Sequence, residues 1–210
     1  MIRVMIADDH AIVRQGLKQI LSETNDISVA GEAETGFEAI TIARQQAFDV
    51  MLLDISLPDR NGIEVLKQIK KDRPSLTILM LSMHNESEFA IRAIKAGAAG
   101  YLNKQSAPMQ LVAAIRQVAE GRKHITPALA QELVNAITSD TEQPLHTSLS
   151  DREYQTLCLI AAGKSLSEIS SSMCLSPKTI SVYRARLMEK LKLTNNSELV
   201  RYAIKHNLVD

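Results

Sequence analysis

A regular alternation of short apolar runs with helical patterns constrains this chain more than any other feature of its sequence. The expected strands lie at residues 2–7, 27–32, 50–54, 76–82 and 99–102. The expected helices lie at residues 10–22, 36–46, 61–71, 86–96 and 108–120. Strands that alternate with helices pair in parallel, because a parallel neighbour needs a crossover connection that usually contains a helix.

The expected strands also indicate which faces of the sheet are covered. Val50-Met51-Leu52-Leu53 is apolar at every position, whereas a strand with one face in water alternates apolar and polar residues. Helices must therefore cover both faces, and the expected fold class is α/β with a doubly wound, five-stranded parallel sheet.

The alternation ends near Gly121. A connecting helix is expected at residues 126–137, and the polar segment 138–148 is typical of a linker. Four further helices and no strand are expected, at residues 151–162, 167–173, 177–191 and 197–206. The sequence therefore predicts a first domain at 1–121, a linker with a connecting helix at 122–147 and a small all-α helix-turn-helix domain at 148–210.

Charge and cysteine content separate the two parts and indicate the compartment. Residues 1–144 carry 15 Lys and Arg against 18 Asp and Glu, and the remainder carries 9 against 6. These net charges of −3 and +3 hint at different partners, although so small a surplus is weak support for nucleic acid. The two separated cysteines, Cys158 and Cys174, are expected as buried thiols, and no apolar run is long enough for a bilayer. We therefore expect a cytoplasmic protein that does not bind membranes.

Polar residues stand at the ends of several expected strands. Asp8 and Asp9 follow the first strand, Asp54 ends the third, Ser82 ends the fourth and Lys104 follows the fifth. The carboxyl ends of parallel strands share one edge, so these side chains should meet where such sheets bind ligands. An acid at a single strand end is more often a loop residue or a helix cap, but the conjunction of all five is far less expected by chance.

The residue types at this edge predict phosphoryl chemistry. Clustered carboxylates repel one another unless a cation is present, and oxygen ligands that also serve phosphate suit Mg²⁺. Asp54 could then attack a phosphoryl group and form an acyl phosphate. The metal and the Lys104 ammonium would neutralise the phosphoryl oxygens, and the Ser82 hydroxyl could donate a hydrogen bond to the attached group.

The first domain resembles the receiver domain of two-component response regulators over about residues 2–121. The segments that carry the resemblance are Ala7-Asp8-Asp9-His10, Leu53-Asp54-Ile55-Ser56-Leu57-Pro58-Asp59-Arg60-Asn61-Gly62, Leu81-Ser82 and Gly97-Ala98-Ala99-Gly100-Tyr101-Leu102-Asn103-Lys104. The resemblance implies a flavodoxin-like fold in which Asp54 is the phosphoacceptor. It implies Mg²⁺ ligands from Asp8, Asp9, Asp54 and the backbone carbonyl of Ser56.

The same resemblance implies that Ser82 and Lys104 contact the phosphoryl group, and that a sensor histidine kinase donates it from a phosphohistidine. Tyr101 matches the aromatic position that turns inward on activation, although a half-buried ring on the last strand is an equal alternative. Many receivers have a cis proline after the lysine, but Gln105 follows here. A cis peptide is therefore not expected, because without proline it is costly.

The second part contains a helix-turn-helix candidate. Ser176 can cap the helix at residues 177–191, and Pro177 suits its first turn. The inward-facing positions of this helix are Ile180, Tyr183 or Arg184, Leu187 and Leu191. The opposite face fits the major groove of DNA, with phosphate contacts expected from Lys178, Arg184, Arg186 and Lys190 and base-facing positions at Ser181, Val182 and Ala185. An ordinary solvated face would explain the basic residues alone, but the helix-turn-helix spacing favours DNA.

Residues 147–208 resemble the LuxR-type helix-turn-helix of NarL/FixJ response regulators. The matching segments are Leu149-Ser150-Asp151-Arg152-Glu153, Ile160-Ala161-Ala162-Gly163-Lys164-Ser165, Leu175-Ser176-Pro177-Lys178-Thr179-Ile180 and Lys190-Leu191. The resemblance implies binding of double-stranded DNA, with Thr179 near the start of the recognition helix, and dimerisation through the last helix, near residues 197–206. Ser181 departs from the basic residue often found there, so base preference does not transfer.

These observations favour a phosphoacceptor and transcription regulator over an enzyme, with self-phosphorylation and autodephosphorylation as its only expected chemistry. An aspartate-nucleophile phosphohydrolase often has a second acid two residues after the nucleophile, where this chain has Ser56. A scaffold that is never phosphorylated would not need the complete acidic site. Our hypothesis is that phosphorylation of Asp54 acts through Ser82 and Tyr101 to free or pair the DNA-binding domains.

Overall fold

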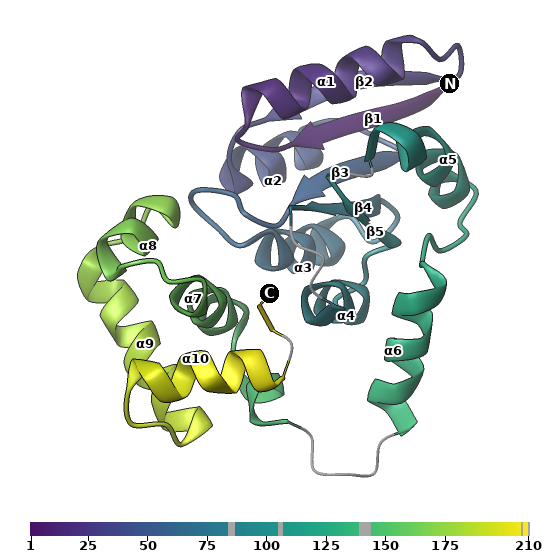
Figure 1. The fold of residues 1–210 in the computed structure, drawn as a ribbon. Coiled ribbons are helices and arrows are strands. Elements are labelled where there is room, and N and C mark those ends of the chain that lie inside the picture. Colours follow the sequence, from purple (N-terminus) through teal and green to yellow (C-terminus); the bar gives the residue numbers. More distant parts are fainter. Residues whose placement is uncertain (84–86, 105–106, 139–143, 207, 210) are drawn as a thin grey trace. The chain divides into compact units, whose positions relative to one another are not determined.

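The fold is shown in Figure 1 as a computed structural model, which describes residues 1–83, 87–104, 107–138, 144–206 and 208–209. The chain divides into two compact units, Met1–Leu133 and Val134–Asp210. The division falls within helix α6, Pro127–Thr138, which takes the place of the expected connecting helix.

The first unit contains a parallel sheet of five strands in the order β2-β1-β3-β4-β5. The strands are β1 Ile2–Ala7, β2 Ile27–Ala33, β3 Val50–Asp54, β4 Thr77–Ser82 and β5 Gly100–Asn103. All four pairings are parallel. The chain passes from β2 back across β1 to β3, so the strand order reverses between β1 and β3 and opens a crevice at their carboxyl ends. The predicted doubly wound α/β class is confirmed.

Five helices cover this sheet in two layers. They are α1 Ala11–Ser22, α2 Gly36–Gln45, α3 Gly62–Asp72, α4 Ser87–Lys95 and α5 Ala107–Ala119. Helices α1 and α5 lie on one face, and α2, α3 and α4 lie on the other (Figure 1). Their bounds agree with the sequence-based expectation to within one or two residues, although Glu86, expected to begin a helix, lies outside the described residues.

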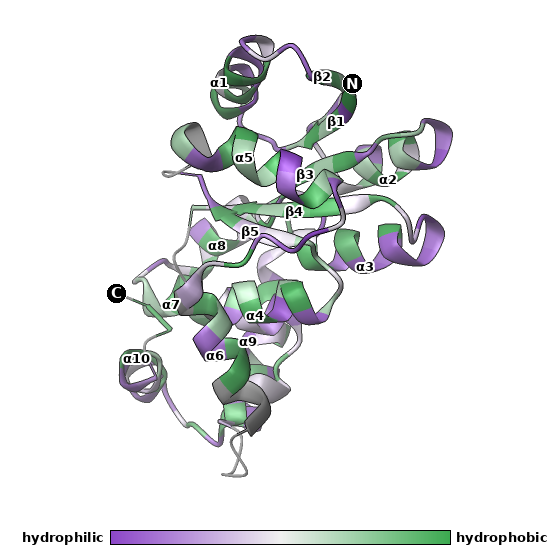
Figure 2. Ribbon diagram, turned by 90° about the vertical axis from the view of Figure 1, so that its right-hand side faces the viewer, coloured by the Kyte–Doolittle hydropathy of each residue, from purple (hydrophilic) through white to green (hydrophobic). Residues whose placement is uncertain are grey.

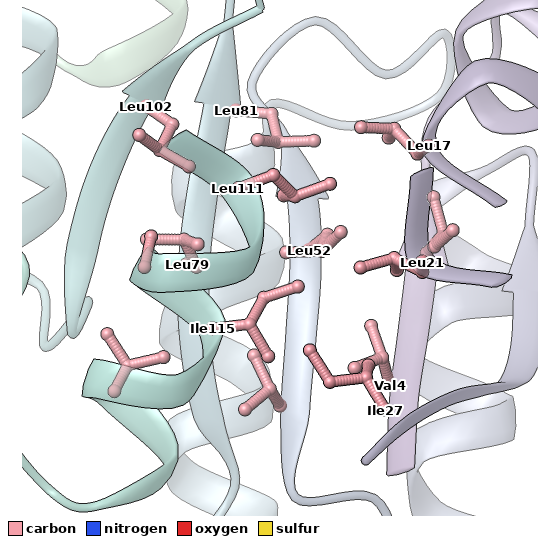
Figure 3. Close-up of a cluster of buried hydrophobic side chains, with 14 residues drawn as sticks. Val4, Leu17, Leu21, Ile27, Leu52, Leu79, Leu81, Leu102, Leu111 and Ile115 are labelled. Atoms are coloured by element: carbon pink, nitrogen blue, oxygen red, sulfur yellow. The ribbon is translucent and has the colours of Figure 1, made fainter. Parts of the chain in front are cut away.

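A hydrophobic core fills the space between the sheet and each layer. Figure 3 shows the cluster beneath α1 and α5, in which Leu17 and Leu21 of α1 meet Leu111 and Ile115 of α5 over the strands. Successive strand residues point to opposite faces. All five residues of β3 are buried, which explains why that strand is apolar throughout. The covering helices carry both hydrophobic and hydrophilic residues, as Figure 2 shows for α2, α3 and α4.

After α5 the chain returns to the outer strand β5. After Gly121, at φ +80°, His124 forms a parallel bridge to Gly100, with its N–H donating to the Ala99 carbonyl at 2.9 Å. The Lys123 ammonium donates to the Ala98 carbonyl at 2.6 Å. A side chain at Gly100 would place its Cβ 2.5 Å from the His124 carbonyl oxygen, so glycine is needed for this close approach. This attachment was not predicted from the sequence.

The second unit is helical throughout its described part. Its elements are the 3₁₀ turn η1 Leu145–Ser148 and the helices α7 Asp151–Ala161, α8 Leu166–Ser172, α9 Pro177–Leu191 and α10 Asn196–Lys205. Capping boxes begin α7 and α8, and the Ser176 hydroxyl accepts from the Thr179 N–H at 3.1 Å to cap α9.

One segment differs from the sequence-based expectation here. The turn η1 stands in the segment expected to be an irregular linker, and the His146 ring nitrogen Nδ1 lies 3.1 Å from the Tyr202 hydroxyl. Residues 139–143 of that linker lie outside the described residues. Within the described ranges, no helix has the length and apolar character needed to span a membrane.

Candidate functional site

Two carboxylates and an ammonium from three different strand ends meet at the crevice between β1 and β3. The Lys104 Nζ lies 2.7 Å from Asp8 Oδ2 and 2.8 Å from Asp54 Oδ2. The side chains of Lys104, Asp8 and Asp54 are 5%, 0% and 2% exposed. The parallel topology thus brings together residues that the sequence separates widely, as the strand-end argument predicted.

The acidic cluster is larger than these two carboxylates. Potential ligand atoms of Asp8, Asp9, His10 and Asp54 all lie within 4.8 Å of one another. Apart from Lys104, the buried Oδ2 atoms of Asp8 and Asp54 have no hydrogen-bond partner in the described part of the chain. Buried anionic oxygens are costly unless their charge is compensated, and a hard cation with oxygen ligands would add to the compensation that Lys104 supplies. The cluster therefore fits a divalent metal ion.

His10 also belongs to this cluster, although no role was predicted for it from the sequence. Its Nδ1 lies 2.7 Å from Asp9 Oδ1 and 3.2 Å from Asp8 Oδ1, and its backbone N–H donates to Asp8 Oδ1 at 2.9 Å. A histidine directly after two candidate metal-binding acids was the available signal. Because a hard cation prefers oxygen, the imidazole is better suited to orient the acids than to ligate the ion.

The electrostatics of the cluster follow from burial. Burial raises the pKa of Asp54, and the charge of Asp8 adds to the rise, while Lys104 and a hydrogen bond from the Ser56 backbone oppose it. Burial alone would lower the pKa of Lys104, but the carboxylates of Asp54 and Asp8 outweigh it and the pKa rises. Lys104 therefore remains a cation, yet it does not fully compensate the carboxylates.

The remaining predicted residues of this site lie nearby. Ser82 is buried at the end of β4, and its carbonyl accepts from the Lys104 N–H at 2.7 Å, which holds the two strand ends together. Tyr101 lies opposite Met80 in the β4–β5 pairing and is 9% exposed. Roles for Ser82 and Tyr101 in switching stay predictions, as does a metal contact from the Ser56 carbonyl. The peptide between Lys104 and Gln105 lies outside the described residues.

The loop that follows β3 holds Asp54 in place. The Gly62 N–H donates to the Ile55 carbonyl at 2.8 Å, and the Asn61 side chain accepts from the Ile63 N–H at 2.8 Å to cap α3. The Asp59 carboxylate accepts from the first two N–H groups of α2, at 2.7 and 2.9 Å. The loop is therefore hydrogen-bonded to the N-termini of both α2 and α3.

The second unit presents the face of α9 that the sequence predicted for DNA. Ile180, Leu187 and Leu191 are buried, while Tyr183 and Arg184 are half-buried. The exposed positions on the other side are Lys178, Ser181, Val182, Ala185 and Arg186. The structure therefore gives α9 one inward stripe and one open face.

Two of the predicted phosphate contacts already have partners within this unit. The Arg184 Nε donates to Asn196 Oδ1 at 2.9 Å, and the Lys190 Nζ lies 2.6 Å from Glu153 Oε2. Their contacts with DNA stay predictions. The expectation of two buried thiols was wrong for Cys174, which is exposed, although Cys158 is buried. Cys174 lies beyond the end of α8 in the tight turn before α9, at φ +49°.

The fold and the acidic edge define a receiver, the signalling domain in which an aspartate at the sheet edge accepts a phosphoryl group. A family model described as response regulator receiver domain matches residues 4–116, and one described as bacterial regulatory proteins, luxR family, matches residues 147–203. The chain therefore belongs to the NarL/FixJ response regulators, which join a receiver to a LuxR-type helix-turn-helix. It is a transcription regulator rather than a phosphohydrolase.

Individual relatives extend the match along the whole chain. Response regulator UvrY of Escherichia coli is 39% identical over 99% of this chain and 96% of its own. Response regulator GacA of Pseudomonas aeruginosa is 36% identical over 100% and 99%. Among solved structures, the RcsB response regulator of Salmonella typhimurium matches with a TM-score of 0.69 and 30% identity, over 96% of each chain.

Proposed function

We propose that Asp54 accepts a phosphoryl group from the phosphohistidine of a sensor histidine kinase, and that this modification controls binding of the chain to promoter DNA. The observation that carries the proposal is the pairing of a buried Asp54 with Lys104 at the switch point of the sheet, beside two further acids. We place the functional boundaries at residues 121 and 148 and the site of action in the cytoplasm.

The geometry supports a direct transfer. A carboxylate oxygen of Asp54 attacks phosphorus and forms an O–P bond, while the P–N bond breaks and the departing imidazole keeps its electron pair and takes up a proton. Lys104 faces Asp54 and can neutralise a phosphoryl oxygen, and the Ser82 hydroxyl can donate to another. Asp8, Asp9, Asp54 and the Ser56 carbonyl would hold Mg²⁺, which supplies further charge neutralisation when bound.

The open face of α9 supports DNA as the second partner. RcsB of Salmonella enterica serovar Typhimurium, 28% identical with a TM-score of 0.64, has been solved bound to the promoter rprA in the presence of phosphomimetic BeF₃⁻. RcsB dimers have also been solved on DNA. We propose that this chain likewise binds double-stranded DNA as a homodimer through α10. The DNA-contacting candidates are Lys178, Thr179, Ser181, Val182, Arg184, Ala185, Arg186 and Lys190.

Coupling between the two events is proposed to run through Ser82 and Tyr101. Phosphorylation shifts an existing equilibrium by its different contacts in the two states, and near-complete switching needs a preference on the order of 5 kcal/mol. Ser82 touches the site through Lys104, and Tyr101 lies on the neighbouring strand β5.

The test compares wild type, Asp54→Asn and a control, Asp26→Asn, whose carboxylate pairs with Arg116 on the surface. Each protein is treated with a small phosphodonor, with Mg²⁺ or with EDTA, and its hydroxylamine-labile phosphate and its affinity for promoter DNA are measured. Wild type and Asp26→Asn should be labelled only with Mg²⁺ and should then bind DNA more tightly. Labelling of Asp54→Asn would contradict the proposal, and so would an equal DNA affinity of wild type with and without phosphorylation.

A further inference from the structure

Arg14 of α1 contacts the turn formed by Asp8 and Asp9, here called the acidic turn. Its side chain is 9% exposed, and its Nη1 donates to the backbone carbonyl of Asp8 at 2.7 Å. A buried guanidinium is costly unless its donors are satisfied, and one of the donors of Arg14 is used on a backbone carbonyl beside the candidate metal-binding acids. None of the roles assigned so far uses this residue.

The partners of Asp8 show what the contact does. Its N–H donates to the Ala33 carbonyl at 3.1 Å, its Oδ1 accepts from the His10 N–H at 2.9 Å, and its Oδ2 faces Lys104. The carbonyl bound by Arg14 belongs to the planar peptide that joins Asp8 to Asp9. Fixing that plane fixes the direction in which Asp9 leaves the turn, and with it the spacing of the two carboxylates.

Arg14 is itself held from the side of β2. Its Nη2 hydrogen bonds to the Glu34 carboxylate, and its Nε lies 3.6 Å from Glu32 Oε2. Glu32 also pairs with Lys18 at 2.6 Å. The planar fork of a guanidinium can span such partners at fixed angles, whereas the compact ammonium of lysine cannot. The Arg14 guanidinium therefore connects the carboxyl ends of β1 and β2 beside the acidic turn.

We propose that Arg14 is a positioning residue for the metal centre, which orients the Asp8–Asp9 turn so that both carboxylates can reach one divalent ion. The inference rests on the proposed function only in assuming that the acidic cluster binds such an ion. A positioning role and a purely electrostatic role predict opposite changes in metal affinity when Arg14 is replaced. Removing a cation near an acidic site should tighten metal binding by reduced repulsion, whereas loss of positioning should weaken it.

The experiment measures Mg²⁺ binding to the full chain by isothermal titration calorimetry without any phosphodonor. The variants are Arg14→Met, Arg14→Lys and the control Lys18→Met, which removes a neighbouring cation that contacts Glu32 but makes no bond to Asp8. We expect Arg14→Met to weaken Mg²⁺ binding by about tenfold, with Arg14→Lys close to it, and Lys18→Met to leave it unchanged or slightly tighter. Unchanged or tighter binding by both Arg14 variants overturns the proposal.

Two further measurements separate the possible causes of failure. Thermal unfolding without Mg²⁺ identifies a variant that has lost its fold, and the conservative Arg14→Lys then carries the test. In the phosphorylation reaction, Arg14→Lys should raise the half-saturating Mg²⁺ concentration while the rate at saturating Mg²⁺ stays near that of wild type. Asp9→Asn serves as the reference, because it removes a proposed metal ligand. If Asp9→Asn and the Arg14 variants all bind Mg²⁺ like wild type, the proposed function fails. If Asp9→Asn weakens Mg²⁺ binding but the Arg14 variants do not, only the positioning role fails.

Discussion

Replacing Gly62 by alanine is expected to displace the phosphoacceptor strand end. A methyl group at this position would lie 2.1 Å from the Asp54 carbonyl oxygen and 2.8 Å from the Ile55 Cα. Ordinary contact begins at 3.4 Å, so the backbone would have to move by more than 1 Å. The atoms in the way belong to the backbone, which cannot rotate aside as the end of a flexible side chain can.

The size of the effect follows from this geometry. An extra methylene group in a packed interior costs about 1–3 kcal/mol, and a clash with backbone places Gly62→Ala at the upper end, a loss of about 3 kcal/mol in the free energy of unfolding. A shift of about 1 Å in a reacting group costs on the order of 100-fold in rate. Phosphorylation of Asp54 by a small donor such as acetyl phosphate should slow by a comparable factor.

Gly16→Ala is the matched control. Gly16 lies within α1, and an added methyl group meets nothing within 4 Å. In a helix this change is expected to stabilise by about 0.5–1 kcal/mol. Urea unfolding followed by circular dichroism gives the free energies, and the rate of acetyl phosphate labelling gives the kinetic effect. If Gly62→Ala unfolds and is labelled like wild type, the close-approach reasoning is wrong.

Three further predictions concern charge. Lys104→Met should lower the free energy of unfolding in EDTA by about 3 kcal/mol, because it strands two buried carboxylates, and Mg²⁺ should restore part of the loss in a thermal scan. The raised pKa of Asp54 means that the folded state holds more protons than the unfolded state above pH 3.8, so this group's contribution to stability falls as pH rises through the raised pKa. Subtracting the metal-free pH profile of Asp54→Asn from that of wild type should show this fall, and a rise would refute the assignment. Arg186→Ala should weaken DNA binding and reduce the salt slope by about 1, whereas Lys190→Ala should destabilise the helical unit through loss of its Glu153 contact. Salt-dependent binding isotherms and urea unfolding distinguish these two outcomes.

The cluster of polar residues at the sheet edge could be predicted because the repeated alternation of strands and helices fixes where each strand ends. Parallel strands end on a common edge, so an acid at the end of β1 and another at the end of β3 must approach one another whatever the intervening helices contain. The inward stripe of α9 was predictable for the same reason, since burial at Ile180, Leu187 and Leu191 follows the helical repeat.

Contacts that depend on tertiary packing were not predictable. Nothing in the spacing of Arg14 indicates that its guanidinium turns beneath the Asp8 carbonyl. Lys190 was predicted as a phosphate contact, and its pairing with Glu153 could not be foreseen because Glu153 lies on another helix. Cys174 was expected to be buried, but α8 ends two residues earlier and the chain turns, which leaves this thiol exposed. Each of these contacts depends on the position or the end of a neighbouring helix or strand, and the spacing of residues along the sequence does not indicate either.

The bridge between Gly100 and His124 affects the choice of the last residue for an isolated receiver domain. β5 is an outer strand of the sheet, and an outer strand exposes N–H and C=O groups that other chains can pair with. Here the chain blocks part of that edge with its own linker, through Lys123 and His124. A fragment that stops at Gly121 would lose both donors to the Ala98 and Ala99 carbonyls and would be prone to self-association, whereas one that continues through α6 would keep this part of the edge covered.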